Sequence, residues 1–308
     1  VLERLGLGYE QLAAANPGLI MVRISGYGQD GPYAERPGYG AICEAFGGVR
    51  HMTGDPDRPP ARVALATTDY LTAVYAAFGA MTAVQERHRS GRGQVVDVAL
   101  YETAFSQMES YVPTYEKLGF VPMRQGPNLP TMAPNSLYPT SDGGWMLIAA
   151  NSDAIFHRLL KSMEHEDLAK DQRFATIKAR GQPQNMKALD ALIATWTCKY
   201  TGAELEHLLH QAEVPHSRTY TIADIYADEH YAARQMIVKV PHARLGHTLQ
   251  VGVVPKLSRT PGAIRHSGPD TGQDTDAVLR DIGLSEAQID ALQRAGVIGP
   301  VKAGATTP

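Results

Sequence analysis

One carboxylate in this chain stands where chemistry is favoured. Asp69 lies between a short apolar run, residues 63–66, and a long Ala-rich segment that we expect to be a helix. The dipole and free N–H groups of a helix N-terminus keep a nearby carboxylate ionised. Such a carboxylate could attack an electrophilic carbonyl carbon, while the N–H groups hold the resulting oxyanion. The same position also suits a simple helix cap, supplied by Thr67, Thr68 or Asp69.

A second pattern is a spacing of glycines. Residues 20–31 read IMVRISGYGQDG, an apolar strand followed by G-x-G-x-x-G. That spacing is typical of a dinucleotide-binding turn, which needs a helix to open at the third glycine. Here Pro32 follows that glycine, and Pro37 would lie inside any such helix at a cost of about 3 kcal/mol. We therefore expect a tight loop without a Rossmann helix, whose backbone N–H groups could still face a ligand.

Other polar clusters have simpler explanations. The basic residues within 87–92 could meet a phosphate, but basic side chains followed by glycine also end many helices. His207 and His210 share one helix face, and no carboxylate or cysteine pattern completes a metal site. The sequence contains no serine nucleophile elbow, no P-loop and no zinc spacing, so we expect no metal centre.

Composition restricts the class of protein further. The 308 residues are 44% hydrophobic and 20% charged, enough for one large or two ordinary domains. A net charge of −3 predicts no nucleic-acid partner, and no apolar run is long enough for a membrane span. Cys43 and Cys198 give no disulfide framework, so a cytoplasmic location is expected. The chain opens on Val1 and on helix-like residues, which suggests a fragment or a gene product without its front.

The elements that must position Asp69 alternate between helices and strands, so the expected class is α/β. Before Asp69 we expect a helix within 1–15, a strand at 19–24 buried on both faces, and a short helix at 41–49. After it we expect a helix at 70–88, a strand at 94–100 and a helix at 101–118. Close packing of the 70–88 helix is favoured by its small residues, Ala73, Ala76, Ala77, Gly79 and Ala80.

The second half of the chain predicts a smaller unit. Residues 119–139 are rich in Pro and Gly and are expected to form a linker. A strand at 144–150 follows, with helices near 153–163, 183–197 and 201–212. The remaining pattern predicts a broken helix at 222–236, strands at 238–240 and 248–254, and a last helix at 285–295 capped by Ser285.

Several of these segments together resemble the family III CoA-transferases, a group that includes formyl-CoA transferase, carnitine CoA-transferase and alpha-methylacyl-CoA racemase. The resemblance runs through VLERLGLGYEQLAAANPGLIMVRISGYGQDGPYAERPGYGAICEAFGGVRHMTG and TTDYLTAVYAAFGAMTAVQERHRSGRGQVVDVALYE. It continues in DQRFATIKAR, VPKLSRTPG and GQDTDAVLRDIGL. The glycine loop is similar to the family's S-G-x-G-x-x-G-P turn, which differs from a dinucleotide fingerprint.

The resemblance implies a mechanism and a set of site residues. Asp69 stands at the family's nucleophile position, where an aspartate attacks an acyl-CoA thioester, forms a mixed anhydride and releases CoA as a thiolate. Water must be excluded meanwhile, because it would hydrolyse the anhydride. Gly26, Gly28, Arg36 and Tyr39 are the residues expected to line the site for substrate and CoA. No permanently bound cofactor is expected; the coenzyme A thioester is a substrate, with a carboxylic acid as the second one.

The resemblance leaves alternatives open. Racemases of the group pair the aspartate with a histidine at the position of Tyr39, and phenol is a poorer base near pH 7 than imidazole. Transfer is therefore favoured over an acyl-CoA racemase or epimerase, and a non-catalytic truncated member is a third alternative. Gly40 stands where the family is usually acidic, which weakens any paired acid there, and Glu44 replaces a frequent glutamine.

The resemblance also implies an architecture, a Rossmann-like large domain plus a smaller α/β domain in an interlocked homodimer with its site near the dimer interface. We assign residues 1–120 and 230–308 to the large domain and 121–229 to the linker and small domain. Family members begin with roughly a hundred more residues, about one nucleotide-binding half of the fold. A sheet without those strands is expected to leave an exposed edge and an exposed apolar face.

Overall fold

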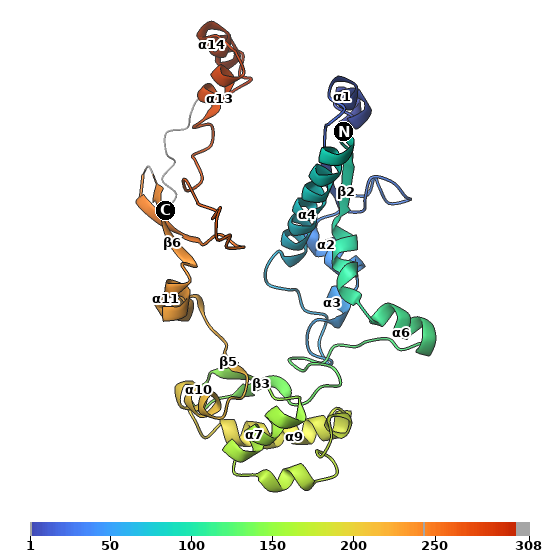
Figure 1. Cartoon of the computed structure of the whole chain (residues 1–308), viewed down its shortest axis with the longest axis vertical. Coiled ribbons are helices and arrows are strands. Elements are labelled where there is room, and N and C mark those ends of the chain that lie inside the picture. The colour runs from blue at the N-terminus through green and yellow to red at the C-terminus, as the bar shows by residue number, and fades with distance from the viewer. Residues whose placement is uncertain (1, 243, 300–308) are drawn as a thin grey trace. The chain divides into compact units, whose positions relative to one another are not determined.

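The computed structural model describes residues 2–242 and 244–299 and divides the chain into two compact units, Val1–Thr219 and Tyr220–Pro308 (Figure 1). Helices and strands alternate along both units, so the α/β class is confirmed. The first unit contains a parallel α/β group followed by an antiparallel group. The assignment of residues 230–308 to the same domain as 1–120 stays a prediction.

The parallel group is built on two strands, β1 (Met21–Ser25) and β2 (Val95–Ala99), paired in register from Met21 with Val95 to Ser25 with Ala99. The connection between them is a long crossover, as parallel strands require. The elements of this group besides the strands are η1 (Glu3–Leu5), α1 (Tyr9–Ala15), α2 (Gly40–Phe46), α3 (Val49–Met52), α4 (Thr67–Ser90), α5 (Leu100–Phe105), η2 (Ser106–Met108) and α6 (Tyr111–Leu118).

Helix α4 packs closely along β2, as its small residues predict (Figure 1). A Cβ atom on Gly79 would lie 2.6 Å from Cγ1 of Val96, so only glycine permits this separation of helix and strand. Ala76 and Ala83 are buried on the same helix. Asp69, in the first turn of α4, is thereby held at a fixed place relative to the sheet.

Two expectations for this group are wrong. Strand β1 is not buried on both faces, because its burial alternates and Ile24 is 52% exposed. Within the described residues β1 pairs only with β2, so this two-stranded sheet lacks the cover that a buried parallel sheet has. The helix expected at 101–118 is interrupted at Glu109, whose φ of 41° is left-handed and ends the helical ladder.

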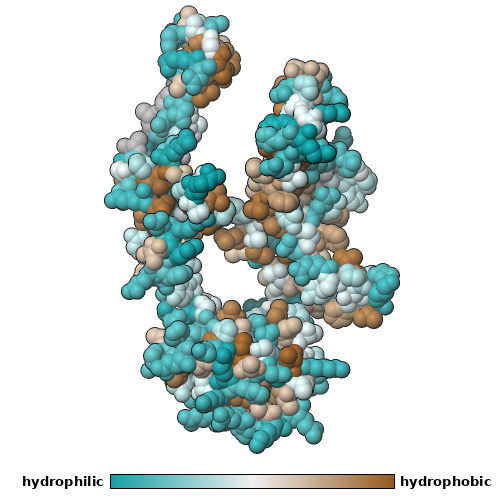
Figure 2. Space-filling view, viewed as in Figure 1, coloured by the Kyte–Doolittle hydropathy of each residue, from teal (hydrophilic) through white to brown (hydrophobic). Residues whose placement is uncertain are grey.

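The expected exposed apolar face is present. On α4 a row of apolar side chains at helical spacing is exposed, and Figure 2 shows apolar side chains at the surface of both units. The row consists of Tyr70, Val74, Phe78 and Met81. Among the residues that the structure describes, no helix is long and apolar enough to cross a membrane.

The antiparallel group has a three-stranded sheet with the order β3-β4-β5, formed by β3 (Asn135–Pro139), β4 (Trp145–Ala149) and β5 (His216–Arg218). Its helices are α7 (Asp153–Ser162), η3 (Glu166–Lys170), α8 (Ile177–Arg180), α9 (Pro183–Thr197) and α10 (Gly202–Gln211). Strand β3 lies inside the segment expected to be a linker, so that expectation is wrong for its last five residues. Ser136 and Tyr138 alternate into the core and explain why a strand forms there.

A charged side chain lies at the centre of this second group. Arg180 is only 1% exposed, and its guanidinium lies over the Phe156 ring at 4.2 Å. Each nitrogen has a partner: Nε donates to the Ala133 carbonyl (3.1 Å), Nη1 to the Phe174 carbonyl (2.9 Å), and Nη2 to the Asn151 carbonyl (3.0 Å) and Asp153 Oδ1 (2.6 Å). One guanidinium therefore joins segments that are far apart in the sequence.

The second unit contains α11 (Ile222–Ala227), α12 (Glu229–Ala233), β6 (Ile237–His242), β7 (Gly246–Val251), α13 (Thr275–Asp281) and α14 (Glu286–Arg294). Strands β6 and β7 form an antiparallel hairpin from Ile237 with Val251 to His242 with Gly246. The expected N-cap is confirmed, because Ser285 Oγ accepts a hydrogen bond from the Gln288 N–H at 3.4 Å.

Candidate active site

The glycine loop after β1 contains no helix, since the next helical residue is Gly40. The prediction that no Rossmann helix opens at Gly31 is therefore confirmed. A Cβ atom on Gly26 would lie 2.8 Å from Gly38 Cα, and one on Gly38 would lie 2.9 Å from Gly26 Cα. Only glycine fits at both positions, and their close approach brings the start of α2 back beside the end of β1.

Gly28 shapes the same loop from within. Its φ of +92° favours glycine, and its N–H donates to Ser25 Oγ at 3.0 Å. The next N–H, of Gln29, donates to Asp97 Oδ2 at 2.8 Å. These two N–H groups are thus used inside the protein, and the loop offers fewer free donors than its glycine spacing suggests.

Asp69 lies in the first turn of α4, and its side chain does not cap the helix. The N-cap residue is Ala66, and no side chain accepts a hydrogen bond from the first turn. The simple capping interpretation of Thr67, Thr68 or Asp69 is therefore wrong. Alanine is a poor N-cap, worth about 1 kcal/mol less than serine or aspartate, so the open helix start lowers stability locally.

The Asp69 carboxylate lies against the first residue of α2. A Cβ atom on Gly40 would overlap Asp69 Oδ2 and would lie 2.7 Å from Asp69 Cγ. Because Tyr39 is the N-cap of α2, the carboxylate lies beside the start of one helix and within the first turn of another. The absence of an acidic residue at position 40 has a physical reason here, because the Asp69 carboxylate occupies the space of any side chain.

A small pocket of about 20 Å³, room for roughly one water, adjoins this exposed carboxylate. Its lining comes from the first turns of α2 and α4 and from the coil that leads into α4. The lining residues are Gly40, Ala41, Glu44, Arg62, Leu65, Ala66, Thr67, Thr68 and Asp69. A carbonyl group that docks over this pocket would meet a carboxylate beside an uncapped helix start, an arrangement compatible with acyl transfer.

Three charged side chains line the pocket. Glu44 is buried, with 5% of its side chain exposed, and its Oε1 lies 3.0 Å from Arg50 Nε in an ion pair. Arg50 Nη2 is buried without a hydrogen-bond partner among the described residues. In the same described part of the chain, Arg62 has neither an ion pair nor a hydrogen bond from its side chain. The pocket therefore presents two carboxylates and one uncommitted guanidinium.

Cys43 lies in α2, and the charge of Asp69 affects the pKa of its thiol. The thiol is buried and donates to the Gly26 carbonyl oxygen at 3.3 Å. Burial raises the pKa of Cys43, and the negative charge of Asp69 raises it further. The thiol is therefore held neutral, which excludes it as a thiolate nucleophile near neutral pH.

The other predicted site residues do not line this pocket. Tyr39 is 77% exposed and adjoins Asp69 only through Gly40. The Arg36 guanidinium lies 3.7 Å from the centre of the Tyr33 ring, at the edge of an aromatic cluster. The structure thus brings Asp69 and the start of α2 together. Gly26 and Gly28 do not line the pocket, but they set the course of the glycine loop that leads to α2.

Among the lining residues that were not assigned to the site from the sequence are Gly40, Glu44 and Arg62. Glu44 had a usable signal, because it lies four residues after Gly40 and therefore on the same face of α2. Arg62 had none, since it lies in a coil where no periodicity indicates a direction.

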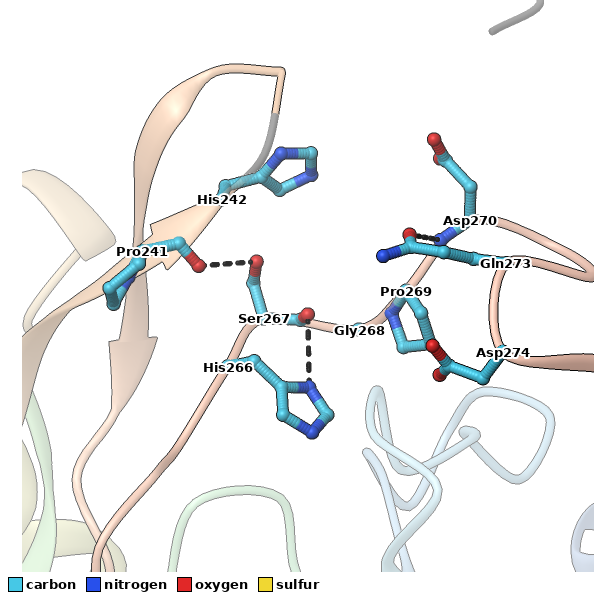
Figure 3. A pocket seen from close by; sticks show the side chains of 9 residues that line it. All are labelled: Pro241, His242, His266, Ser267, Gly268, Pro269, Asp270, Gln273 and Asp274. Carbon is cyan, nitrogen blue, oxygen red and sulfur yellow. Dashed lines mark hydrogen bonds between the residues drawn. The ribbon is translucent and has the colours of Figure 1, made fainter. Parts of the chain in front are cut away.

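A second pocket lies within the Tyr220–Pro308 unit (Figure 3). The side chains of His242 and Gln273 point toward each other across it. Ser267 Oγ donates to the Pro241 carbonyl at 2.9 Å, whereas His266 Nδ1 faces the Ser267 carbonyl at 3.4 Å. The histidine is therefore not placed to activate the serine hydroxyl, and this pocket lacks the nucleophile and base pair of a hydrolase.

Comparison with known proteins identifies the family of the chain. The model of CoA-transferase family III matches residues 1–275. The chain is 47% identical over 298 residues to succinyl-CoA–D-citramalate CoA-transferase of Chloroflexus aurantiacus, covering 96% of this chain and 74% of that protein. It is 36% identical over 301 residues to the succinyl-CoA–L-malate CoA-transferase beta subunit of the same organism, again covering 96% and 74%.

A solved structure shows the same fold. A CAIB/BAIF family protein from Brucella suis has a TM-score of 0.78 and 32% identity, covering 91% of this chain and 72% of that one. The chain therefore belongs to CoA-transferase family III. It is an enzyme that moves CoA between an acyl-CoA thioester and a carboxylic acid, and the sequence prediction is confirmed at that level.

Proposed function

We propose that Asp69 is the nucleophile of this CoA transfer and that the exchanged acids are dicarboxylic. The observation that carries the first part is the position of its carboxylate, in a pocket beside the uncapped start of α4 and against Gly40. The second part is supported by the names of the two relatives, since succinate, citramalate and malate each have two carboxylates.

The transfer proceeds by four acyl exchanges. The Asp69 carboxylate attacks the thioester carbonyl, the C–S bond breaks, and an Asp69-acyl anhydride and CoA thiolate form. The thiolate attacks the Asp69 carbonyl carbon, which releases the donor acid and leaves an Asp69 thioester. The acceptor carboxylate displaces the thiolate to form a second anhydride. The thiolate then attacks the acceptor's acyl carbon, which gives the new acyl-CoA and restores Asp69.

The surroundings of Asp69 have distinct tasks in this scheme. The N–H groups at the open start of α4 stabilise the oxyanion of each tetrahedral intermediate. Tyr39 and Arg36, both exposed, contact the CoA moiety, while Gly26 and Gly28 set the loop that carries them. CoA enters as a substrate, and no permanently bound cofactor takes part.

The assembly belongs to the same proposal. We infer a homodimer of interlocked chains, with a Rossmann-like large domain formed by residues 1–120 and 230–308 and a small domain within 121–229. We also infer a cytoplasmic location, which the two free cysteines support. Sedimentation of the purified chain tests the dimer, since a monomer at all concentrations would contradict it.

The test of the nucleophile uses succinyl-CoA with malate or citramalate as acceptor, with products separated by chromatography. Asp69→Asn removes the nucleophile and should abolish turnover, by more than about 1,000-fold. Asp57→Asn, an exposed change in the preceding loop, is the matched control and should retain full activity. Hydroxylamine should attack the activated Asp69 carbonyl and displace CoA thiolate or the donor acid, which leaves a hydroxamate that mass spectrometry detects on the peptide that contains Asp69. Full turnover by Asp69→Asn would refute the proposal.

The racemase alternative makes a different prediction. An acyl-CoA racemase or epimerase exchanges deuterium at the α-carbon of its substrate without any acceptor acid. We expect no such exchange, and transfer only when an acceptor is present. Mass spectrometry of the acyl-CoA after incubation in deuterated water separates the two activities.

A further inference from the structure

We propose that Arg62 binds the second carboxylate of a dicarboxylic substrate and makes the Asp69 pocket selective for dicarboxylic over monocarboxylic acyl groups. This inference rests on the proposed role of Asp69 and names a residue and an interaction that the transfer itself does not require. It starts from the charges of the pocket.

The guanidinium of Arg62 is the positively charged group that lines this pocket. The charged groups that line it are Glu44, Arg62 and Asp69. Glu44 is already paired with Arg50 at 3.0 Å, outside the lining. Arg62 has no acidic partner among the described residues, although it lies on the same pocket as two carboxylates. Its charge is therefore available to a ligand.

The coil around Arg62 is anchored at its base. The Ala61 N–H donates to the Thr53 carbonyl at 2.9 Å, and Gly54 has a φ of +111°. A Cβ atom on Gly54 would lie 3.0 Å from Ala61 N, so the two segments are in close contact. The residue directly before Arg62 thus has a fixed position, which orders the backbone that carries the guanidinium.

The chemistry of a dicarboxylic substrate requires a cation here. Asp69 must be ionised to attack, and Glu44 contributes a second carboxylate whose charge Arg50 already opposes in part. A substrate carboxylate that enters beside them is repelled unless a positive charge opposes the repulsion. The planar fork of arginine binds a carboxylate through two parallel hydrogen bonds.

The same group discriminates against monocarboxylic substrates. An acyl chain that ends in a methyl group would cover the Arg62 guanidinium without offering it a partner. Covering an unpaired charge is unfavourable, so the pocket rejects that chain as well as favouring the charged one. Selectivity then arises from the difference between the two complexes.

The experiment compares two donors that differ only in the distal group. Succinyl-CoA carries a carboxylate where butyryl-CoA carries a methyl group. CoA release in the presence of hydroxylamine, after subtraction of the release by Asp69→Asn under the same conditions, reports acylation of Asp69 from each donor without the need for an acceptor acid. The variants are Arg62→Met and Arg62→Lys. The matched control is Arg58→Met, since Arg58 lies in the same coil but outside the pocket, and its side chain is 76% exposed.

We expect Arg62→Met to lower kcat/KM for succinyl-CoA by about 10- to 100-fold, the usual effect of losing a hydrogen-bonded charge pair. Its kcat/KM for butyryl-CoA should stay unchanged or rise, so that the ratio between donors collapses. Arg62→Lys should retain an intermediate ratio, and Arg58→Met should match the unaltered protein. Binding of free CoA, measured by calorimetry, should be the same in all variants.

Two results would overturn the inference. An equal loss with both donors, or weaker binding of free CoA by Arg62→Met, would mean that Arg62 contacts the CoA moiety instead. Failure of the proposed function looks different, because the unaltered chain would then release no CoA from either donor, or Asp69→Asn would still release it.

Discussion

Three helices of the antiparallel group begin with side-chain caps and α9 begins at Pro183, whereas the helices around Asp69 begin without such caps. Caps are provided in α7, α8 and α10 by Ser152, Thr176 and Thr201. The N-cap positions of α2, α4 and α5 are Tyr39, Ala66 and Ala99, and none of them accepts a hydrogen bond. One region therefore satisfies its helix starts internally, and the other leaves them open for a ligand.

The buried Arg180 and the half-buried Arg50 differ in the same way. Arg180, in the antiparallel group, has a partner for each nitrogen. Arg50 pairs with Glu44 but leaves Nη2 buried and unpartnered among the described residues. The antiparallel group is thus built for stability, while the region of Asp69 gives up stability where it must receive a substrate.

The largest effect that would sharpen this comparison is expected at Arg180. Arg180→Met leaves the carbonyls of Ala133, Phe174 and Asn151 without a donor, and should lower the free energy of unfolding by about 3–5 kcal/mol. Urea unfolding measures this loss. Arg173→Met is the control, because Arg173 forms an ion pair with Asp171 at the surface, where solvent screening makes the contribution of such a pair small. Equal losses of unfolding free energy in both variants would show that the buried Arg180 stabilises the protein no more than the exposed Arg173.

A large effect on activity without a loss of stability is expected at Gly40. In Gly40→Ala the new methyl group would displace the Asp69 carboxylate, and such a misplacement lowers turnover by about 100-fold. The unfolding transition should be unchanged, because alanine is tolerated at a helix start. Gly299→Ala, where a Cβ meets open space, should affect neither quantity. Unaltered turnover in Gly40→Ala would show that the carboxylate need not lie against α2.

A smaller, pH-dependent effect is expected in the antiparallel core. Tyr138 donates to Asp190 Oδ1 at 2.7 Å. Burial raises the pKa of Asp190, while the hydrogen bond from Tyr138 opposes that rise. Since the folded pKa lies above the unfolded one, the unfolded state loses its proton first. The contribution of Asp190 to stability is therefore full below the unfolded pKa, and it falls as the pH rises through the folded pKa.

Asp190→Asn removes that dependence. As the pH rises from about 4 through the raised pKa of Asp190, the unaltered protein should lose unfolding free energy relative to Asp190→Asn. Tyr138→Phe should cost about 1–2 kcal/mol at neutral pH, because it leaves Asp190 partly buried without its donor. Denaturation series at several pH values check both, and parallel curves for the unaltered protein and Asp190→Asn would contradict the assignment.

The smallest effect is expected from closing the open helix start. Ala66→Ser provides the cap that α4 lacks and should stabilise the protein by about 0.5–1 kcal/mol. The same hydroxyl would accept a hydrogen bond from an N–H group at the start of α4, beside the pocket. Turnover should therefore fall while the melting temperature rises. A gain in stability with full activity would show that this helix start plays no part in the reaction.

Local patterns in the sequence predicted much of the fold. The helix at 183–197 agrees with α9 because Pro183 fixes its first turn and its apolar residues repeat at helical spacing. Strand β3 was missed because Asn135 and Pro139 are poor strand residues, and it forms only through pairing with β4. The exposure of β1 depends on how many strands pair with it, which no local pattern records.

The same contrast between local patterns and long-range contacts applies to the candidate site. Asp69 could be found because an apolar run and a helix start are adjacent in the sequence. That its carboxylate leaves α4 uncapped and lies against Gly40 depends on the approach of two helices. Arg62 reaches the same pocket only because Gly54 and Ala61 are in contact at the base of its coil. Such long-range contacts decide which charges meet.

The Arg180 guanidinium acts on its domain as a structural zinc ion or a disulfide acts on a small secreted one. It closes the chain between Ala133 and Arg180 by hydrogen bonds, where those proteins use metal–ligand or covalent bonds. Unlike a disulfide, this clasp is insensitive to reducing agents, and unlike zinc it cannot be removed by a chelator. The surface segments between its contact points can therefore lengthen or shorten, provided that the three carbonyls still reach the same side chain.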